Sequence, residues 1–269
     1  SDLPGWTRTC ANTASTGCSS VTEGMPSGVT VSIVSHGQGH MVVSLLDDLS
    51  RCAGVERVIV IQNIPEDDIP CPESLLPRVL LLRNAQPLGF AANHNQGFRH
   101  CETSLFAVLN PDIRLTDEPF PQLAAALETT GGGVIAPAVR HPDGSIEDSA
   151  RDFPTPLRLL RKFMRLGDGR ITPKSLVPLD VDWVAGMFLL FPAGTFRDIG
   201  GFDEDFFLYY EDVDICTRLW RSGRRVILHP GVTVIHAAQR ASRRKLRYMK
   251  WHLFSMLRYF GKHVWRLPR

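Results

Sequence analysis

The chain has 269 residues, of which 43% are hydrophobic and 22% are charged, and its formal net charge is +2. The composition is that of an ordinary globular protein, and the length is sufficient for one large domain or two small ones. No run of about 18 apolar residues occurs, so the sequence predicts no membrane-spanning helix. The 6 cysteines form no CxxC pair and no zinc spacing, which favours a reducing compartment over a disulfide scaffold.

The first 24 residues differ in character from the rest of the chain. They are rich in Ser, Thr and Gly, show no hydrophobic period, and lack the charged start and apolar run of a signal peptide. We therefore expect residues 1–24 to be a non-native or disordered tail, with a short ordered arm as the alternative. The domain is expected to begin at Met25, just before the first strand pattern.

From Val29 onward, apolar strands alternate with amphipathic helices. Strands are predicted at 29–36, 56–63, 78–84, 104–112, 133–139 and 181–192, with short strands over 224–236. Helices are predicted at 39–52, 90–101, 120–130 and 209–223, with a basic helix over 152–167 after a turn at 141–146. Because the strands read as continuous apolar runs, we expect an α/β fold whose mainly parallel sheet is covered on both faces. Neither a repeat nor a linker interrupts residues 25–239, which we interpret as one domain.

Polar side chains follow the first four strands: Ser35 and His36, then Gln62 and Asn63, then Asn84, then Asn110 and Asp112. Ligands of open α/β sheets bind beyond the carboxyl ends of the strands, so a binding site is expected there. The loop SHGQGH lacks the third glycine of a dinucleotide motif, and no P-loop is present, so hydride transfer and ATP hydrolysis are disfavoured. Asp112 is a hard oxygen ligand suited to a divalent cation, although Asn110 and Asp112 could simply shape a turn around Pro111.

The stretch GGFDEDFFLYYEDVDICTR, residues 200–218, mixes carboxylates with large aromatic side chains. Carboxylates normally stay in water and large aromatic residues do not, so this combination needs an explanation. Acidic residues in a first helical turn are favoured by the helix dipole. We accept that explanation for Asp214, because Arg218 lies four residues further on and can pair with it.

Four motifs, in order and with suitable spacing, resemble the inverting glycosyltransferases of family 2, in particular the bacterial rhamnosyltransferase-like group of O-antigen and capsular polysaccharide synthesis. The motifs are GFAANHNQG, LNPD, VDWVAGMFLLFP, and GGFDEDFFLYYEDVDICTRLWRSG with a closing HPGVTVIH, and the resemblance covers residues 29–239. It implies a GT-A fold, a nucleotide-diphosphate sugar donor, Mg²⁺ or Mn²⁺ as cofactor, and transfer with inversion.

The resemblance also implies roles for individual residues. Inversion requires one carboxylate opposite the leaving diphosphate, to accept a proton from the acceptor hydroxyl, and this is assigned to Asp212. Glu211 would orient Asp212 or bind the acceptor, and Asp112 and His236 would hold the cation. The donor-binding residues are Ser35, His36, Gln62, Asn63, Asn84, Asn93, Asn110, Asp112, Trp183 and Gly186. The acceptor-side residues are Phe202, Asp203 and Glu204.

One departure from the family pattern affects the choice of donor. Many relatives end the second strand in Asp-Asn, where the Asp reads the base, and this chain has Gln62-Asn63. An amide can still bond a base edge, but it is no longer an acceptor only. We expect dTDP-rhamnose as donor, with a UDP-sugar as the alternative. A sugar nucleotidyltransferase is disfavoured because SHGQGH has no Lys or Arg, and an inactive glycan-binding homologue because the ED and NPD motifs are intact.

The C-terminal part of the chain is strongly basic. From Ile215 to the end no acidic residue occurs, whereas fourteen of the 30 Lys and Arg lie there. Residues 240–269 predict a basic amphipathic helix with an apolar stripe of Leu246, Met249, Leu253, Met256 or Leu257, and Phe260. Such a helix suits peripheral contact with a membrane, or packing on the domain or on a second copy in a homodimer. Nucleic acid is not expected. The resemblance implies a saccharide or lipid-linked saccharide as acceptor. We therefore predict a cytoplasmic protein, with peripheral contact on the inner face of the cytoplasmic membrane as the first of the two interpretations of this helix.

Overall fold

A computed structural model describes residues 27–156, 158, 164, 169–173, 175–237 and 246–263. The tail predicted at 1–24 lies outside these residues, as does most of the basic helix predicted at 152–167. None of the described helices is long and apolar enough to cross a membrane.

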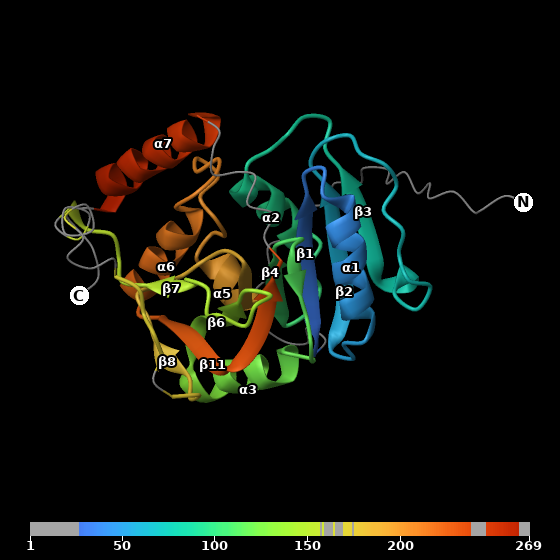
Figure 1. Cartoon of the computed structure of the whole chain (residues 1–269), viewed down its shortest axis with the longest axis horizontal. Helices are drawn as coiled ribbons and strands as arrows, with labels where there is room; N and C mark the ends of the chain where they lie inside the picture. Colours follow the sequence, from blue (N-terminus) through green and yellow to red (C-terminus); the bar gives the residue numbers. More distant parts are fainter. Residues whose placement is uncertain are drawn as a thin grey trace, which may run out of the picture.

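Within the described part of the chain, a nine-stranded sheet runs through the centre of the molecule (Figure 1). Its order is β3-β2-β1-β4-β10-β6-β11-β5, and β8 pairs with β11 beside this path. The strands are β1 (Val29–Ser35), β2 (Val55–Gln62), β3 (Val79–Arg83), β4 (Leu105–Leu109), β5 (Ile113–Arg114), β6 (Gly132–Arg140), β8 (Leu179–Asp180), β10 (Phe188–Pro192) and β11 (Arg225–His236). The pairs among β1 to β4 and between β6 and β11 are parallel, whereas β10 is antiparallel to both its neighbours.

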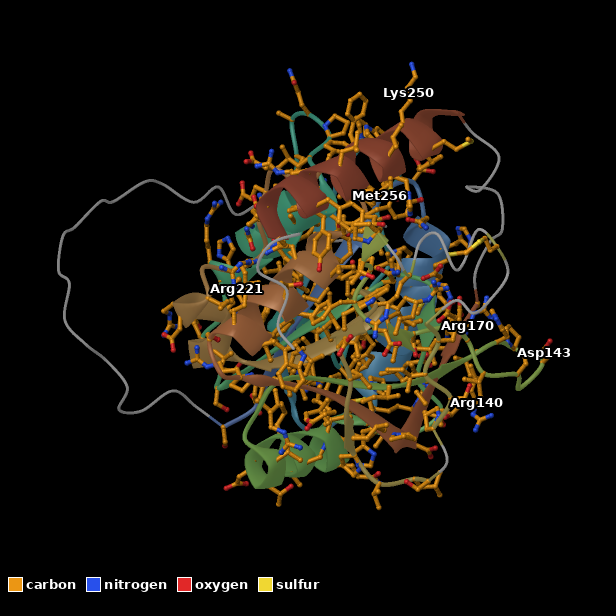
Figure 2. The ribbon with its side chains drawn as sticks, turned by 90° about the vertical axis from the view of Figure 1, so that its left-hand side faces the viewer. Arg140, Asp143, Arg170, Arg221, Lys250 and Met256 are labelled. Atoms are coloured by element: carbon orange, nitrogen blue, oxygen red, sulfur yellow. The ribbon has the colours of Figure 1, made fainter. Side chains whose placement is uncertain are left out.

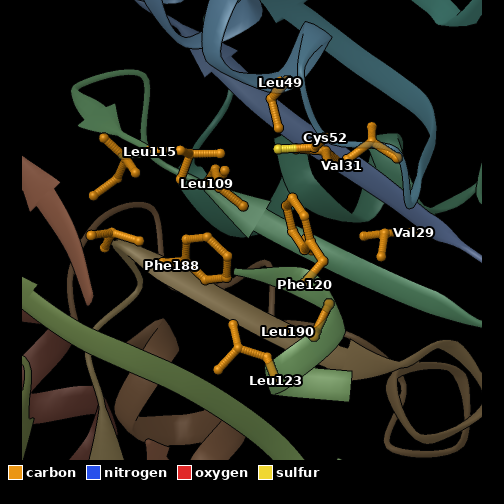
Figure 3. Close-up of a cluster of buried hydrophobic side chains, with 14 of the residues drawn as sticks. Val29, Val31, Leu49, Cys52, Leu109, Leu115, Phe120, Leu123, Phe188 and Leu190 are labelled. Carbon is orange, nitrogen blue, oxygen red and sulfur yellow. The ribbon is translucent and has the colours of Figure 1, made fainter. Parts of the chain in front are cut away.

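Helices cover both faces of this sheet. They are α1 (Gly39–Ser50), α2 (Phe90–Phe98), α3 (Phe120–Thr130), α5 (Ala193–Asp198), α6 (Glu211–Arg221) and α7 (Leu246–His263), with a short 3-10 helix at Leu76–Arg78. Side chains of α1 and α3 belong to one buried cluster, part of which Figure 3 shows around Phe120 and Phe188. Side chains of α2, α5, α6 and α7 belong to a second cluster on the other face.

The two clusters follow from the two-residue period of the strands. In β4, Ala107 and Leu109 join the first cluster, whereas Phe106 and Val108 join the second. A strand that is apolar at every position can bury both its faces only between two layers of helices, and the sequence predicted this arrangement from its continuous apolar runs.

The strand predicted at 181–192 is interrupted in the structure. Trp183–Val184 forms the short strand β9, which pairs with β7 (Ala150–Arg151) outside the central sheet, and β10 begins only at Phe188. The reason lies in the partners of the intervening segment, because the amide of Ala185 donates to Ser149 and that of Gly186 donates to a side chain of α6. The apolar run alone could not show that these amides bond outside the sheet.

Two further boundaries differ from the prediction. Helix α6 begins at Glu211 rather than at Tyr209, because Tyr209 and Tyr210 have positive φ values of 70° and 68°, which no helix accommodates. The strands expected over 224–236 form the single strand β11, which shifts register between His229 and Thr233.

The C-terminal helix packs with a different face from the one predicted. The buried residues of α7 are Ser255, Tyr259 and His263, whereas Met249, Leu253 and Leu257 of the predicted stripe are exposed. Met256 and Phe260 do pack against the second cluster. Hydrogen bonds determine which face of the helix is buried, because Tyr259 bonds with Thr217 and His263 bonds with Asp214 in the interior. A count of apolar residues could not reveal these two contacts.

Candidate active site

Asp212 occupies the second position of α6, and both of its carboxylate oxygens accept hydrogen bonds from backbone amides. Its Oδ2 accepts from the amide of Gly186 at 3.1 Å, and its Oδ1 accepts from the amide of Val213 at 2.8 Å. A Cβ on Gly186 would lie 3.1 Å from the Phe90 ring and 3.8 Å from Cβ of Asp212. Glycine therefore permits the close approach between the 185–187 segment and α6.

Glu211 and Asp212 are adjacent carboxyls in different environments. Burial raises the pKa of Glu211 well above its usual value, and the neighbouring Asp212 raises it further. Burial also raises the pKa of Asp212, but the amides of Gly186 and Val213 oppose this effect. Oε2 of Glu211 is buried without a hydrogen-bond partner. Burial therefore favours the neutral form of Glu211, whereas two backbone amides stabilise the charged form of Asp212.

A second group of side chains surrounds His236 at the end of β11. The pairing of β11 with β5 places His236 opposite Ile113, and the amide of Ala237 donates to the carbonyl of Asp112. Nε2 of His236 then lies 3.0 Å from Oδ2 of Asp112. Oδ1 of Asp112 is buried without a partner. A carboxylate oxygen and an imidazole nitrogen side by side suit a divalent cation, and the unpartnered Oδ1 is consistent with one.

Glu147 completes this group and was missed by the sequence analysis. Its Oε2 lies 2.6 Å from Nδ1 of His236 and 3.5 Å from Nδ1 of His141. Burial by itself lowers the pKa of His236, but the hydrogen bonds and charges of Asp112 and Glu147 raise it above its ordinary value. Only the fold of the 141–149 segment brings Glu147 here, and its sequence resembles any polar turn.

One short segment links the two groups. The amide of Gly186 donates to Asp212, and the carbonyl of Met187 accepts from the amide of Asn110, at 2.9 Å. Asn110 precedes Asp112 by two residues at the end of β4. The 185–187 segment therefore contacts Asp212 on one side and the loop that carries Asp112 on the other.

The polar residues after β1 to β3 mostly bind one another. Asn63, Asn84 and Asn93 form a chain of amides, with 2.9 Å from Asn84 to Asn63 and 2.7 Å from Asn84 to Asn93. They also bind the backbone of Leu88 and Gly89, while Asn63 reaches Nδ1 of His36 at 3.2 Å. These amides shape the 84–89 segment, so direct contact between them and a donor stays a prediction.

Gln62, the residue expected to read the base, is also engaged within the protein. Its Oε1 accepts from Arg83 at 2.8 Å and its Nε2 donates to the carbonyl of Asp67 at 3.1 Å, and the side chain is buried. Ser35 donates instead to Glu66, another residue that sequence reasoning did not identify, at 2.9 Å. The other carboxylate oxygen of Glu66 is buried without a partner.

The loop before α6 is held from two sides. Asn95 bonds both the amide and the carbonyl of Phe202 and also Glu204, and the amide of Phe90 donates to Phe207 at 2.9 Å. A Cβ on Gly89 would lie 2.5 Å from the Phe207 carbonyl oxygen, so glycine is required for this contact. From α7, Lys262 pairs with Asp203.

Three of the predicted site residues have structural contacts of their own. Phe202 is buried among aromatic rings, with its centroid 5.4 Å from that of Phe196, and so supports the loop from beneath. Asp203 is paired with Lys262, and Trp183 donates to the carbonyl of Asp152 at 3.0 Å. Their contacts with acceptor and donor stay predictions.

Comparison with known sequences shows that this chain is similar to glycosyltransferases. The model of the family "Glycosyl transferase family 2" matches residues 42–184, slightly more than half of the chain. Rhamnosyltransferase WbbL of Escherichia coli (strain K12) is 28% identical over 253 residues, covering 87% of this chain and 93% of that protein. The N-acetylglucosaminyl-diphospho-decaprenol L-rhamnosyltransferase of Mycobacterium tuberculosis (strain ATCC 25618 / H37Rv) is 34% identical over 142 residues, covering 48% of this chain and 45% of that longer protein.

Solved structures share the fold at low sequence identity. GalNAc-T7 with UDP, GalNAc and Mn²⁺ superposes with a TM-score of 0.62 at 15% identity, covering 80% of this chain and 44% of that one. The mannosyltransferase PcManGT from Pyrobaculum calidifontis, in complex with GDP-Man and Mn²⁺, gives a TM-score of 0.61 at 16% identity, covering 90% of this chain and 65% of that one. At this identity the likeness establishes the GT-A fold, and the fold class expected from the sequence is confirmed.

Proposed function

The chain belongs to glycosyl transferase family 2, and from this premise we propose that it transfers L-rhamnose from dTDP-rhamnose, with inversion, to a lipid-linked saccharide during synthesis of a cell-surface polysaccharide. The observation that carries the proposal is the arrangement around the 185–187 segment, where Asp212 meets Gly186 and Asn110 meets Met187. A single displacement requires a base near the attacking hydroxyl and positive charge near the leaving diphosphate, held in a fixed relation to each other. One segment that contacts both Asp212 and Asn110 can hold them in this way.

In this proposal Asp212 accepts the proton of the acceptor hydroxyl as that oxygen attacks the anomeric carbon. The amides of Gly186 and Val213 hold the carboxylate in one orientation, so the proton is accepted at a fixed place. Burial raises the pKa of the neighbouring Glu211, which favours its neutral form and disfavours a second negative charge beside Asp212.

Asp112 and His236 would hold a divalent cation, Mg²⁺ or Mn²⁺, at the donor side. A cation bound there would neutralise charge on the leaving diphosphate. Among the residues that the structure describes, no three His, Cys, Asp or Glu side chains are arranged to hold a metal by themselves. The donor diphosphate and water would therefore supply the remaining oxygen ligands, and a diphosphate ligand would link cation binding to donor binding.

The outer face of α7 supports contact with a lipid surface. Met249, Leu253, Phe254 and Leu257 are 63%, 50%, 68% and 57% exposed on this helix. Figure 2 shows Lys250 pointing away from the body and Met256 lying on the inner side of α7. Five more basic residues, Arg240, Arg243, Arg244, Lys245 and Arg247, precede the exposed face in the sequence. Apolar side chains among basic ones suit an anionic membrane surface.

A lipid surface fits this face better than a second copy of the chain does. In a symmetric dimer through α7 the outward-pointing Lys250 of both copies would come together, whereas Arg258 and Lys262 already pair with Asp205 and Asp203 of their own chain. Phe207 lies on the loop before α6 and is 40% exposed. Its ring packs against that of Trp251 on α7, with 4.9 Å between the ring centroids. Docking through α7 would place that loop near a lipid-linked acceptor, on the cytoplasmic side of the membrane.

A panel of nucleotide sugars tests the donor assignment. The protein is incubated with Mn²⁺ and, in turn, with dTDP-rhamnose, UDP-sugars and GDP-mannose, and the slow release of nucleoside diphosphate is measured. Fastest release from dTDP-rhamnose is expected. Fastest release from a UDP-sugar would establish the alternative donor. This alternative is tested because both polar atoms of the Gln62 side chain bond within the protein, so Gln62 does not by itself select one base. Pyrophosphate release from a nucleoside triphosphate and a sugar 1-phosphate would instead reveal a nucleotidyltransferase.

A further inference from the structure

Glu147 lies at the end of a folded-back segment that reaches His236 from the side opposite Asp112. The chain turns after β6, with the amide of His141 donating to Ser145, and returns so that the amide of Glu147 donates to Val139 at 2.8 Å. Because β11 runs parallel to β6 with Ile235 opposite Arg140, this return brings Glu147 beside the last residue of β11. The three side chains, Glu147, His236 and Asp112, are only 16%, 11% and 14% exposed.

The contacts place one carboxylate on each nitrogen of the imidazole ring. Nδ1 of His236 is 2.6 Å from Glu147 and Nε2 is 3.0 Å from Asp112. An imidazole binds a cation through the lone pair of one nitrogen, and its other nitrogen then carries the hydrogen. A carboxylate at Nδ1 accepts that hydrogen, which leaves Nε2, on the Asp112 side, as the nitrogen able to bind a cation.

We propose that Glu147 is a positioning residue for the cation site: it selects the tautomer of His236 that has its hydrogen on Nδ1, and it fixes the ring so that Nε2 and Asp112 act together. This rests on the proposed use of a cation by Asp112 and His236. Glu147 is not a third ligand in this assignment, because the ring of His236 separates it from Asp112.

Carboxylate partners of this kind typically change metal affinity by about 10- to 100-fold when they are removed. Glu147→Ala should therefore weaken Mn²⁺ binding by about that factor, measured by electron paramagnetic resonance titration in the presence of dTDP. Glu147→Gln should fall between Glu147→Ala and the unaltered protein, because the amide oxygen can still accept from Nδ1 but brings no charge. Binding of dTDP without cation should be the same in all three proteins.

Three reference variants separate the possible outcomes. Glu128→Ala removes an exposed carboxylate of α3 and should leave Mn²⁺ binding unchanged. Asp112→Ala and His236→Ala should each abolish the Mn²⁺ signal of bound metal. If both do so while Glu147→Ala binds Mn²⁺ like the unaltered protein, the role of Glu147 is wrong and the cation site stands. If Asp112→Ala also binds Mn²⁺ normally, the proposed cation site itself fails.

A spectroscopic measurement keeps the proposal testable where Glu147→Ala folds poorly. Electron spin echo modulation detects a nitrogen bound directly to Mn²⁺, and the unaltered protein should show it with dTDP present. Glu147→Gln, which preserves shape, should show this nitrogen signal at reduced intensity at the same Mn²⁺ occupancy. An undiminished signal in Glu147→Gln together with an unchanged Mn²⁺ affinity would contradict the proposal.

Discussion

The carboxylate of Asp214 on α6 accepts a hydrogen bond of 2.7 Å from Nε2 of His263 on α7, and neither side chain has any exposed surface. Arg218 and Lys262 also contact Asp214, each at 2.7 Å. Asp214 is two residues from Asp212, so the C-terminal helix is attached to the same helix that carries the proposed base. The sequence suggested only that Asp214 pairs with Arg218. In the structure Asp214 also joins α6 to α7.

Asp214→Asn should destabilise the protein by about 3 kcal/mol, because it removes the charge of a fully buried carboxylate that Arg218, Lys262 and His263 all contact. Urea unfolding at pH 7 measures this change. Asp198→Asn is the matched control, since Asp198 pairs with Arg224 on the surface and is 57% exposed. An exposed pair contributes less than about 1 kcal/mol, so a similar effect of both variants would contradict the prediction.

The same network predicts how stability depends on acid. Burial raises the pKa of Asp214, but His263, Arg218 and Lys262 lower it to about 2, below its ordinary value of 3.8. A folded-state pKa below the unfolded one adds stability that is present above pH 3.8 and is lost as the pH falls toward 2. The stability difference between the unaltered protein and Asp214→Asn should therefore be constant near neutral pH and shrink below pH 3.8. A difference that stays constant through this window would refute the assigned shift.

Asp212→Asn should reduce sugar transfer by a factor of about 10² or more, as expected for a lost general base. The amide keeps the shape of the side chain, so nucleotide binding and thermal stability should stay close to those of the unaltered protein. Initial rates of transfer and dTDP titrations provide the two measurements. Nearly full turnover in Asp212→Asn would mean that another carboxylate, with Glu211 or Asp203 next to consider, takes the proton.

The raised pKa values of the adjacent carboxyls predict two effects of pH. Asp212 must be ionised to act as base, so the acid limb of kcat/KM should lie above the ordinary aspartate value of 3.8. Glu211 has a raised folded-state pKa, so its protonated form adds stability below 4.5 that is lost as the pH rises through the folded value. Glu211→Gln should consequently lose less stability than the unaltered protein does as the pH rises above 4.5, as measured by thermal unfolding. Equal losses would mean that Glu211 titrates normally.

Asp112→Ala should lower donor affinity and activity together, because Asp112 would hold the cation that neutralises charge on the diphosphate. Chelation of the unaltered protein should have the same effect, and added Mn²⁺ should restore only the unaltered protein. Nucleotide-sugar binding by calorimetry, with and without Mn²⁺, separates the two contributions. Full activity in excess chelator would point to a cation-independent site.

The outer face of α7 predicts salt-sensitive binding to anionic vesicles. The chain should float with vesicles that contain phosphatidylglycerol at low salt, and less so at high salt or with neutral lipid alone. Replacing Leu253 and Phe254 by Ser should reduce flotation strongly. The matched control replaces Leu176 and Val177 by Ser, since these are 71% and 63% exposed outside α7. If the unaltered chain stays in solution at low salt, membrane docking through α7 is wrong.

The sequence by itself determined the layers of this protein and the chemistry available at one edge of its sheet. Continuous apolar runs such as VIVI (58–61) and FAVL (106–109) are buried between helices on both faces, and the polar residues after those runs gather where the strands end. These features depend on local periodicity, which is why the α/β fold could be predicted. Asp212 and His236 became candidates only through the resemblance to a family, and the roles of both stay predictions.

The tertiary structure decided which of these residues meet and what holds them. Glu147 and His236 are 89 positions apart, and Asp214 and His263 are 49 apart, so no local pattern marks either pair. The same is true of the interrupted strand at 185–187, whose amides bond to other segments, and of α7, which turns its polar Ser255 and His263 inward. Each of these outcomes depends on a hydrogen bond between distant segments, and hydrophobic periodicity contains no information about such partners.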